Sequence, residues 1–153
     1  MNKVKSVFKS KKGEGYIDVV ISVIVLLSVA ILTINIYSFY TLKTKMNEIA
    51  NVLIDTATQT GEFGETFDTM VGVMHANNPG LNFTVSIGAE EWYNSTLHQV
   101  QYGTRMSVSV NTTHVLNGGG MFRINIPCSV VRSGLSEGVH RGVDNHTEPE
   151  GGG

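Results

Sequence analysis

The longest apolar run in the chain extends from Val19 to Tyr40 and contains no charged residue, histidine, proline or glycine. A helix over this run would be about 33 Å long, against a hydrocarbon core of about 30 Å in a bilayer. The run is rich in Val and Ile, but a single segment in lipid must satisfy its own backbone groups and therefore has to be a helix. The pattern predicts one transmembrane helix, placed at residues 14–40.

The apolar pattern changes after Tyr40 but does not stop. Apolar residues now recur at steps of four and three, with polar residues between them, until Gly61 provides a helix stop. The members of this stripe are Leu42, Met46, Ile49, Leu53 and Ala57. We expect one helix from about Tyr16 to Thr60, whose outer half is the spine of a domain. Two helices with a bend near residues 40–43 fit the same periodicity.

Shorter periodic segments complete the predicted fold. Phe67, Met70, Val71 and Met74 have the spacing of a short second helix over residues 65–76. The period then changes to two, which predicts half-buried strands. Their inward residues are Leu81, Phe83, Val85, Ile87, Met106, Val108, Val110, Phe122, Ile124 and Ile126.

A glycine loop, Gly118–Gly120, joins the second and third predicted strands as a hairpin. Residues 129–133 extend the last strand past Pro127. The fold class is α+β, with a long N-terminal helix, a short second helix and a small antiparallel sheet of three to four strands.

Lysines flank the apolar run unequally, since Lys3, Lys5, Lys9, Lys11 and Lys12 precede it and only Lys43 and Lys45 follow closely. The bias keeps the N-terminus in the cytoplasm. It predicts a basic leader at residues 1–13, a single-pass location in the cell membrane and an extracytoplasmic domain at 41–137. Residues 138–153 are polar, acidic and glycine-ended, which predicts a disordered tail.

Charge and cysteine content narrow the possible functions. The chain has 153 residues and a net charge of −2, but residues 41–153 carry six basic and eleven acidic side chains. The outer part is therefore acidic, and a nucleic-acid partner is not expected because phosphate binding requires a basic patch. The single cysteine, Cys128, excludes an intrachain disulfide and is expected to be a small buried apolar residue rather than a reactive thiol.

The junction between leader and span has its own pattern. Lys11-Lys12-Gly13 is followed by Glu14, and Asp18 is the fifth residue after Gly13. Cleavage after Gly13 would create an α-ammonium on Glu14, one helical turn from Asp18. A charge in hydrocarbon costs about 2.5–3.5 kcal/mol, so an acid paired with an amine of its own or the next subunit enters the bilayer more easily. In an uncleaved anchor, Asp18 is simply the last interfacial residue.

These residues resemble the leader of type IV pilins and pseudopilins, in which a peptidase cuts after Gly and an acid is fifth in the mature chain. The usual acid is Glu, which is one methylene longer than Asp18. The order of glycine-bearing loop and strands around residues 100–137 is similar to that of TadE-like pseudopilins. It is closest to uncharacterised TadE-like small membrane proteins encoded near conjugation genes of Gram-positive bacteria. The resemblance implies processing by a prepilin-type peptidase and assembly with like or related pilin-type subunits.

Ser28 and Asn35 are polar exceptions within the span and share one helix face. Small and hydrogen-bonding residues on one face suit helix–helix contact in lipid, so both are candidate assembly residues together with Asp18. Equally, hydroxyl groups in the span can bond to the backbone of the preceding turn, and Asn35 lies close to an aromatic belt at Tyr37 and Tyr40.

No catalytic pattern is evident in the sequence. His75, His98, His114, His140 and His146 are scattered without metal-ligand spacing, and no cofactor or enzymatic activity is expected. Glu90-Glu91 beside Trp92 is read as a solvated loop, with Trp92 capping the edge of the sheet. The sequence favours a pseudopilin-like structural subunit. The alternative is an uncleaved signal-anchor protein whose outer domain binds a ligand or partner.

Overall fold

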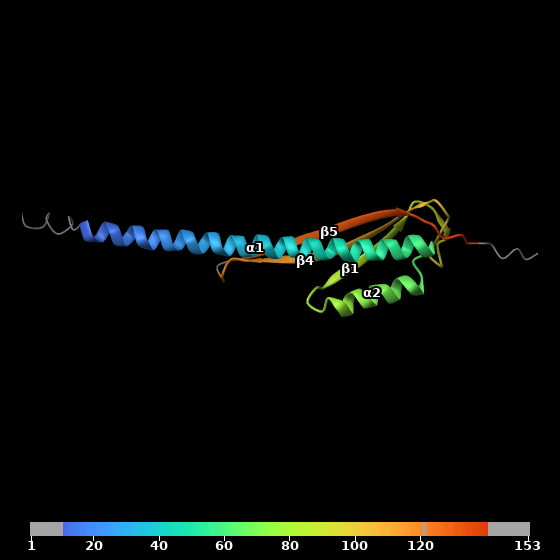
Figure 1. Ribbon diagram of the computed structural model, residues 1–153, viewed down its shortest axis with the longest axis horizontal. Coiled ribbons are helices and arrows are strands. Elements are labelled where there is room, and N and C mark those ends of the chain that lie inside the picture. Colours follow the sequence, from blue (N-terminus) through green and yellow to red (C-terminus); the bar gives the residue numbers. More distant parts are fainter. Residues whose placement is uncertain (1–10, 121, 141–153) are drawn as a thin grey trace, which may run out of the picture. The chain divides into compact units, whose positions relative to one another are not determined.

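The computed structural model describes residues 11–120 and 122–140 of the chain (Figure 1). Its elements are α1 (Lys11–Thr60), α2 (Glu65–Asn77), β1 (Phe83–Ala89), β2 (Trp92–Asn94), β3 (Gln99–Val100), β4 (Arg105–Asn117) and β5 (Arg123–Leu135). The predicted α+β class is confirmed. Most of the basic leader and residues 141–153 of the predicted tail, with His146, lie outside the described residues.

Helix α1 runs without interruption from the predicted span into the amphipathic stretch, which confirms one helix rather than two. It ends where the glycine signal predicted, because Gly61 has a φ of 70° and its N–H donates to the Ala57 carbonyl at 2.8 Å. A positive φ of this kind is the usual end of a helix and is open to glycine at little cost.

The chain divides into two compact units, each of which combines two segments that are separate in the sequence. The first contains α1 up to Leu42 together with the tip of the β4–β5 hairpin, His114–Ile126. The second contains Lys43–Thr113 and the chain from Pro127 onward.

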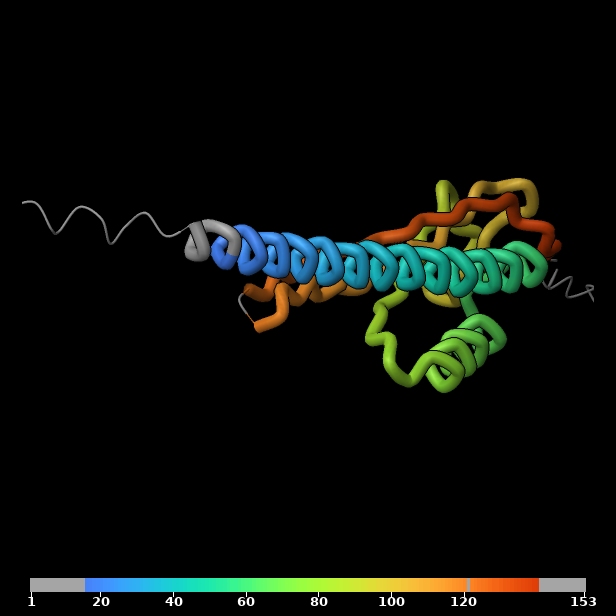
Figure 2. Tube along the Cα trace, turned by 60° about the vertical axis from the view of Figure 1, so that its left-hand side comes forward, coloured from blue at the N-terminus to red at the C-terminus, as the bar shows by residue number. Residues whose placement is uncertain are grey.

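Figure 2 traces the backbone of the second unit, and the buried apolar residues of this unit form the hydrophobic core. The predicted stripe of α1 is buried here at Met46, Ile49, Leu53 and Ala57. The sheet has the order β1-β4-β5, and β1 and β4 are antiparallel with Val85 opposite Val110. The fully buried residues of β4 are the predicted ones, Met106, Val108 and Val110, and Cys128 and Val130 of β5 join them.

The prediction of an inward face is wrong for the start of β5. Phe122 and Ile124 are 52% and 51% exposed. They lie in the first unit, in the hairpin tip, whereas the buried residues of β5 begin at Cys128. The alternation correctly assigns these residues to one face of the strand, but an alternating pattern does not show whether anything covers that face.

The structure also contains a small second sheet that the sequence did not predict. Strands β2 and β3 pair antiparallel, and Trp92 lies in β2 opposite Val100 rather than in a loop. The Trp92 ring is 5.9 Å from that of Phe63 and 5.6 Å from that of His98. Strands of two or three residues are too short to show a period of two, so their pattern could not be recognised.

Candidate membrane and assembly surface

The first half of α1 presents an apolar surface with nothing packed over most of it. From Tyr16 to Tyr40 nearly every side chain is exposed, and Ile31 and Asn35 are the half-buried exceptions. In the part of the chain that the structure describes, α1 is the one helix long and apolar enough to cross a membrane. A helix with the length and composition expected of a membrane span is thus present.

The predicted processing residues lie at the beginning of this helix. Gly13 and Glu14 fall within the first turn of α1, which starts at Lys11. Asp18 follows Glu14 by one turn, is exposed, and is the only charged residue from Tyr16 to Tyr40. The backbone geometry therefore has the relation between residues 14 and 18 that the sequence predicted.

Ser28 and Thr33 use their side chains within the chain. The Ser28 hydroxyl donates to the Ile24 carbonyl and the Thr33 hydroxyl to the Val29 carbonyl, both at 2.8 Å. Bonds of this kind to the preceding turn are the alternative that the sequence offered to helix–helix contact. Ser28 still lies on the same face as Asn35, where both line one groove.

Asn35 makes a connection that could not be anticipated, because its partner is 82 residues away. Its Nδ2 donates to the Asn117 carbonyl at 3.1 Å, and its Oδ1 accepts from the Asn117 N–H at 3.2 Å. The same Nδ2 donates to the Ile31 carbonyl at 2.8 Å. One amide side chain thus binds both backbone groups of the last residue of β4.

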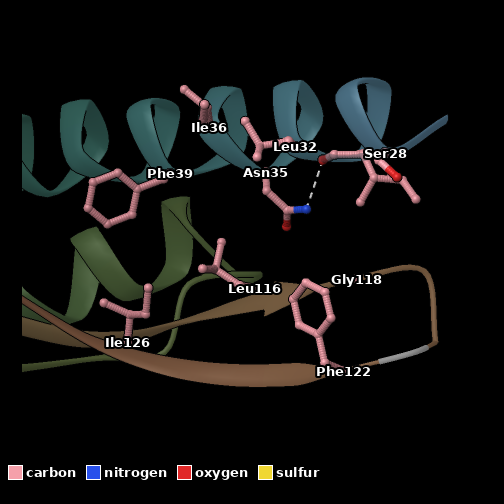
Figure 3. Close-up of a pocket in the computed structure, with 10 residues that line it drawn as sticks. Ser28, Leu32, Asn35, Ile36, Phe39, Leu116, Gly118, Phe122 and Ile126 are labelled. Carbon is pink, nitrogen blue, oxygen red and sulfur yellow. Dashed lines mark hydrogen bonds between the residues drawn. The ribbon is translucent and has the colours of Figure 1, made fainter. Parts of the chain in front are cut away.

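An apolar groove lies between α1 and the hairpin tip in this first unit. Its volume is about 510 Å³. Figure 3 shows side chains from the helix and from the hairpin pointing toward one another across it. The helix contributes Leu32, Ile36 and Phe39, and the hairpin contributes Leu116, Phe122 and Ile126.

His114 lies at the base of the hairpin tip and is buried. Its ring is 5.6 Å from that of Phe39 in an edge-on arrangement. Its Nε2 has no hydrogen-bond partner among the described residues. The other described histidines are far from it in sequence and make separate contacts, such as the stacking of His75 on Phe83 at 4.0 Å.

No group of three potential metal ligands gathers within residues 11–120 and 122–140. Glu90 and Glu91 are exposed at the start of the small sheet. The His140 ring nitrogen lies 3.0 Å from the Gly61 carbonyl, where it meets the end of α1. These residues do not converge on a site, so the candidate surface of this chain is the helix with its hairpin.

The fold and this surface define a class of protein. It is a small α+β protein built on a long helix, whose first half is apolar and exposed and whose second half forms part of a core. The chain belongs to the family described as domain of unknown function DUF4320, which matches residues 20–141. The matched region includes almost all of the apolar run. Searches of the curated proteins and of the solved structures find no match.

Proposed function

We propose that the protein is a membrane-anchored, pseudopilin-like structural subunit of a secretion, pilus or conjugation apparatus. Its leader is cytoplasmic, its α+β domain lies outside the membrane, and it assembles through the first half of α1. The observation that carries the proposal is the exposed apolar surface from Tyr16 to Tyr40 on an uninterrupted helix.

This surface is far larger than the apolar patches that soluble monomers expose. Lipid covers it when the subunit is stored in the membrane, and neighbouring helices cover it in an assembly. Asp18 is the one charge that such packing brings into an apolar environment. Pairing with the α-ammonium of a processed neighbour offsets the cost of burying that carboxylate and favours one register between subunits.

The first test is the state of the N-terminus. The protein is extracted from the membranes of its own host, and its intact mass and N-terminal sequence are determined. A mature chain that begins at Glu14 supports prepilin-type processing at Gly13. A chain that begins at Met1 contradicts it.

Assembly is tested by crosslinking. In a Cys128→Ser background, single cysteines at Val23, Ile24, Val25 and Leu26 sample all sides of the span. We expect oxidative crosslinks between copies at one or two adjacent positions. Asp18→Asn should reduce their yield several-fold, whereas Asp18→Glu, which keeps the charge, should retain it. Equal yields for the two Asp18 variants would exclude a role for the carboxylate in register.

The second candidate is an uncleaved anchor whose outer domain binds a ligand or partner. It is favoured by the internal hydrogen bonds of Ser28 and Asn35, because side chains satisfied within the chain need no neighbouring helix. A chain beginning at Met1, together with span cysteines that do not crosslink, would select this function.

A further inference from the structure

We propose that the tip of the β4–β5 hairpin is a second membrane-contacting element, which inserts into the outer leaflet so that a lipid acyl chain fills the groove beside α1. The inference rests on the proposed membrane anchor. It adds a lipid-binding surface to a part of the chain that lies far from the span in sequence.

The tip of the hairpin is attached to α1 through Asn35. Asn35 holds both backbone groups of Asn117. Next to it, a Cβ atom on Gly119 would lie 3.2 Å from Ile31 Cδ1, so the turn approaches the helix closely. The tip therefore meets α1 at the level of Ile31 to Asn35.

The level of Ile31 to Asn35 on the helix corresponds to a particular depth in the bilayer. Measured along the helix axis from Asp18, Ile31 is about 20 Å and Asn35 about 25 Å away, within a hydrocarbon core of about 30 Å. If Asp18 marks the inner boundary, the tip lies about 5–10 Å below the outer one. This is the depth at which interfacial elements bury their apolar faces.

The backbone of the turn is suited to a position inside the bilayer. A segment at membrane depth has to satisfy its backbone groups inside the protein. The Asn117 N–H donates to Asn35, the Gly118 N–H donates to the Phe122 carbonyl at 3.0 Å, and the Gly120 N–H donates to Asn117 Oδ1 at 3.3 Å. The turn thus satisfies these donors without water.

The side chains of the tip are also suited to lipid. Residues 115–122 include no charged residue. Phe122 and Ile124 are more than half exposed, which is unfavourable in water and favourable in lipid. Arg123 lies between them in the sequence and is exposed, and a long basic side chain at this depth can extend to the headgroups.

The position, lining and size of the groove indicate that its occupant is a lipid acyl chain. Because its helix wall belongs to the span, the medium at this depth is lipid hydrocarbon. Its walls are almost entirely apolar, and its volume of about 510 Å³ suits a slender chain. A helix from a second copy has a diameter of about 10 Å with its side chains and is too wide for a recess of this size.

The test measures contact with acyl chains directly. Full-length protein is reconstituted into phosphatidylcholine vesicles whose acyl chains carry bromine, which quenches tryptophan fluorescence on contact. Trp92→Phe removes the natural fluorophore, and a single tryptophan is then placed at Phe122, at Ile24 in the span, or at exposed Tyr102 in the second unit. We expect quenching of several-fold at positions 24 and 122 and none at 102.

The outcomes separate this inference from the anchor itself. Quenching at position 24 with none at 122 overturns the lipid-contacting hairpin and leaves the anchor intact. No quenching at either position overturns the anchor. Intermolecular crosslinks from a cysteine at 122, without quenching of the tryptophan there, would show that a second copy fills the groove.

A variant of Asn35 sharpens the result. Asn35→Ala should reduce the quenching of the tryptophan at 122 but not of that at 24, because it releases the hairpin and not the helix. Thr33→Ala is the matched control, since the Thr33 hydroxyl bonds only within its own helix. If Phe122→Trp does not fold, Val115→Cys in a Cys128→Ser background carries a solvent-sensitive dye instead. Its emission should shift to the blue in vesicles, and a water-like emission would overturn the proposal.

Discussion

The two halves of α1 use the same element for opposite purposes. Leu26 in the first half is 69% exposed, whereas Leu53 in the second half is 0% exposed. The first half is apolar on every side, and the second half confines its apolar residues to one stripe with polar residues elsewhere. The distribution of apolar residues around the helix, rather than the helix itself, therefore distinguishes the exposed half from the half that packs in the core.

Each half also has a polar connection to β4 or β5, and the two connections differ in kind. In the second half, Arg132 of β5 donates to Asn51 Oδ1 at 2.8 Å and to Asn47 Oδ1 at 2.7 Å. In the first half, Asn35 binds the backbone of Asn117. The connection of the second half uses a charged side chain, whereas that of the first half uses only neutral groups.

The largest expected effect comes from truncating a leucine in each half. Leu53→Ala should lower the free energy of unfolding by about 2–5 kcal/mol, because it opens a cavity in the core. Leu26→Ala, its matched control, should leave that free energy nearly unchanged. Both are measured by denaturant unfolding in detergent, followed by the fluorescence of Trp92, which lies in the same unit as Leu53. Equal losses would mean that Leu26 has a partner in the folded chain.

The next effect concerns the end of the second half. Gly61→Ala should cost about 1–3 kcal/mol, because the residue has a positive φ and its new Cβ would meet the Gly138 backbone. Gly72→Ala in α2 is the control, since no atom lies within 4 Å of its new Cβ. It should stabilise the protein by about 0.5–1 kcal/mol. The same unfolding assay measures both, and a neutral Gly61→Ala would show that the end of α1 relaxes freely.

The sequence predicted well the elements in which a periodic pattern extends over many residues. The stripe through Met46 and Leu53 spans several turns, so both the helix and its buried face followed from it. The sheet was predicted in the same way through Val108 and Val110 of β4.

The sequence predicted less about burial and hydrogen-bond partners, because both depend on which distant part of the chain packs against a residue. The strand pattern placed Phe122 and Ile124 correctly on one face, but it could not show that both side chains stay more than half exposed. The partner of Asn35 was not predictable, because a single amide has no period and Asn117 is 82 residues distant. The role of Asp18 in assembly remains a prediction, since the structure contains a single chain.

A smaller effect is expected from the polar connection of the second half. Arg132→Ala removes the hydrogen bonds to Asn47 and Asn51 and should cost about 1 kcal/mol, because the arginine is only half-buried. Arg105→Ala, at the exposed start of β4, should stay within about 0.5 kcal/mol of the parent. A double-mutant cycle of Arg132→Ala with Asn51→Ala isolates the pair. Strict additivity in that cycle would assign the loss to the bond with Asn47 or to the apolar stem of Arg132 instead.

The smallest effect is expected from the matching connection in the first half. Hydrogen bonds between side chains in membranes contribute on average about 0.6 kcal/mol, which is a factor of about three in an equilibrium constant. Asn35→Ala should therefore speed hydrogen exchange at the Asn117 amide about threefold. Thr33→Ala should not, and the amide of Val110, deep in β4, should be unaffected by either. An unchanged exchange rate at the Asn117 amide would mean that the end of the hairpin is stabilised without the helix. The first half of α1 would then contribute only to contacts with other molecules.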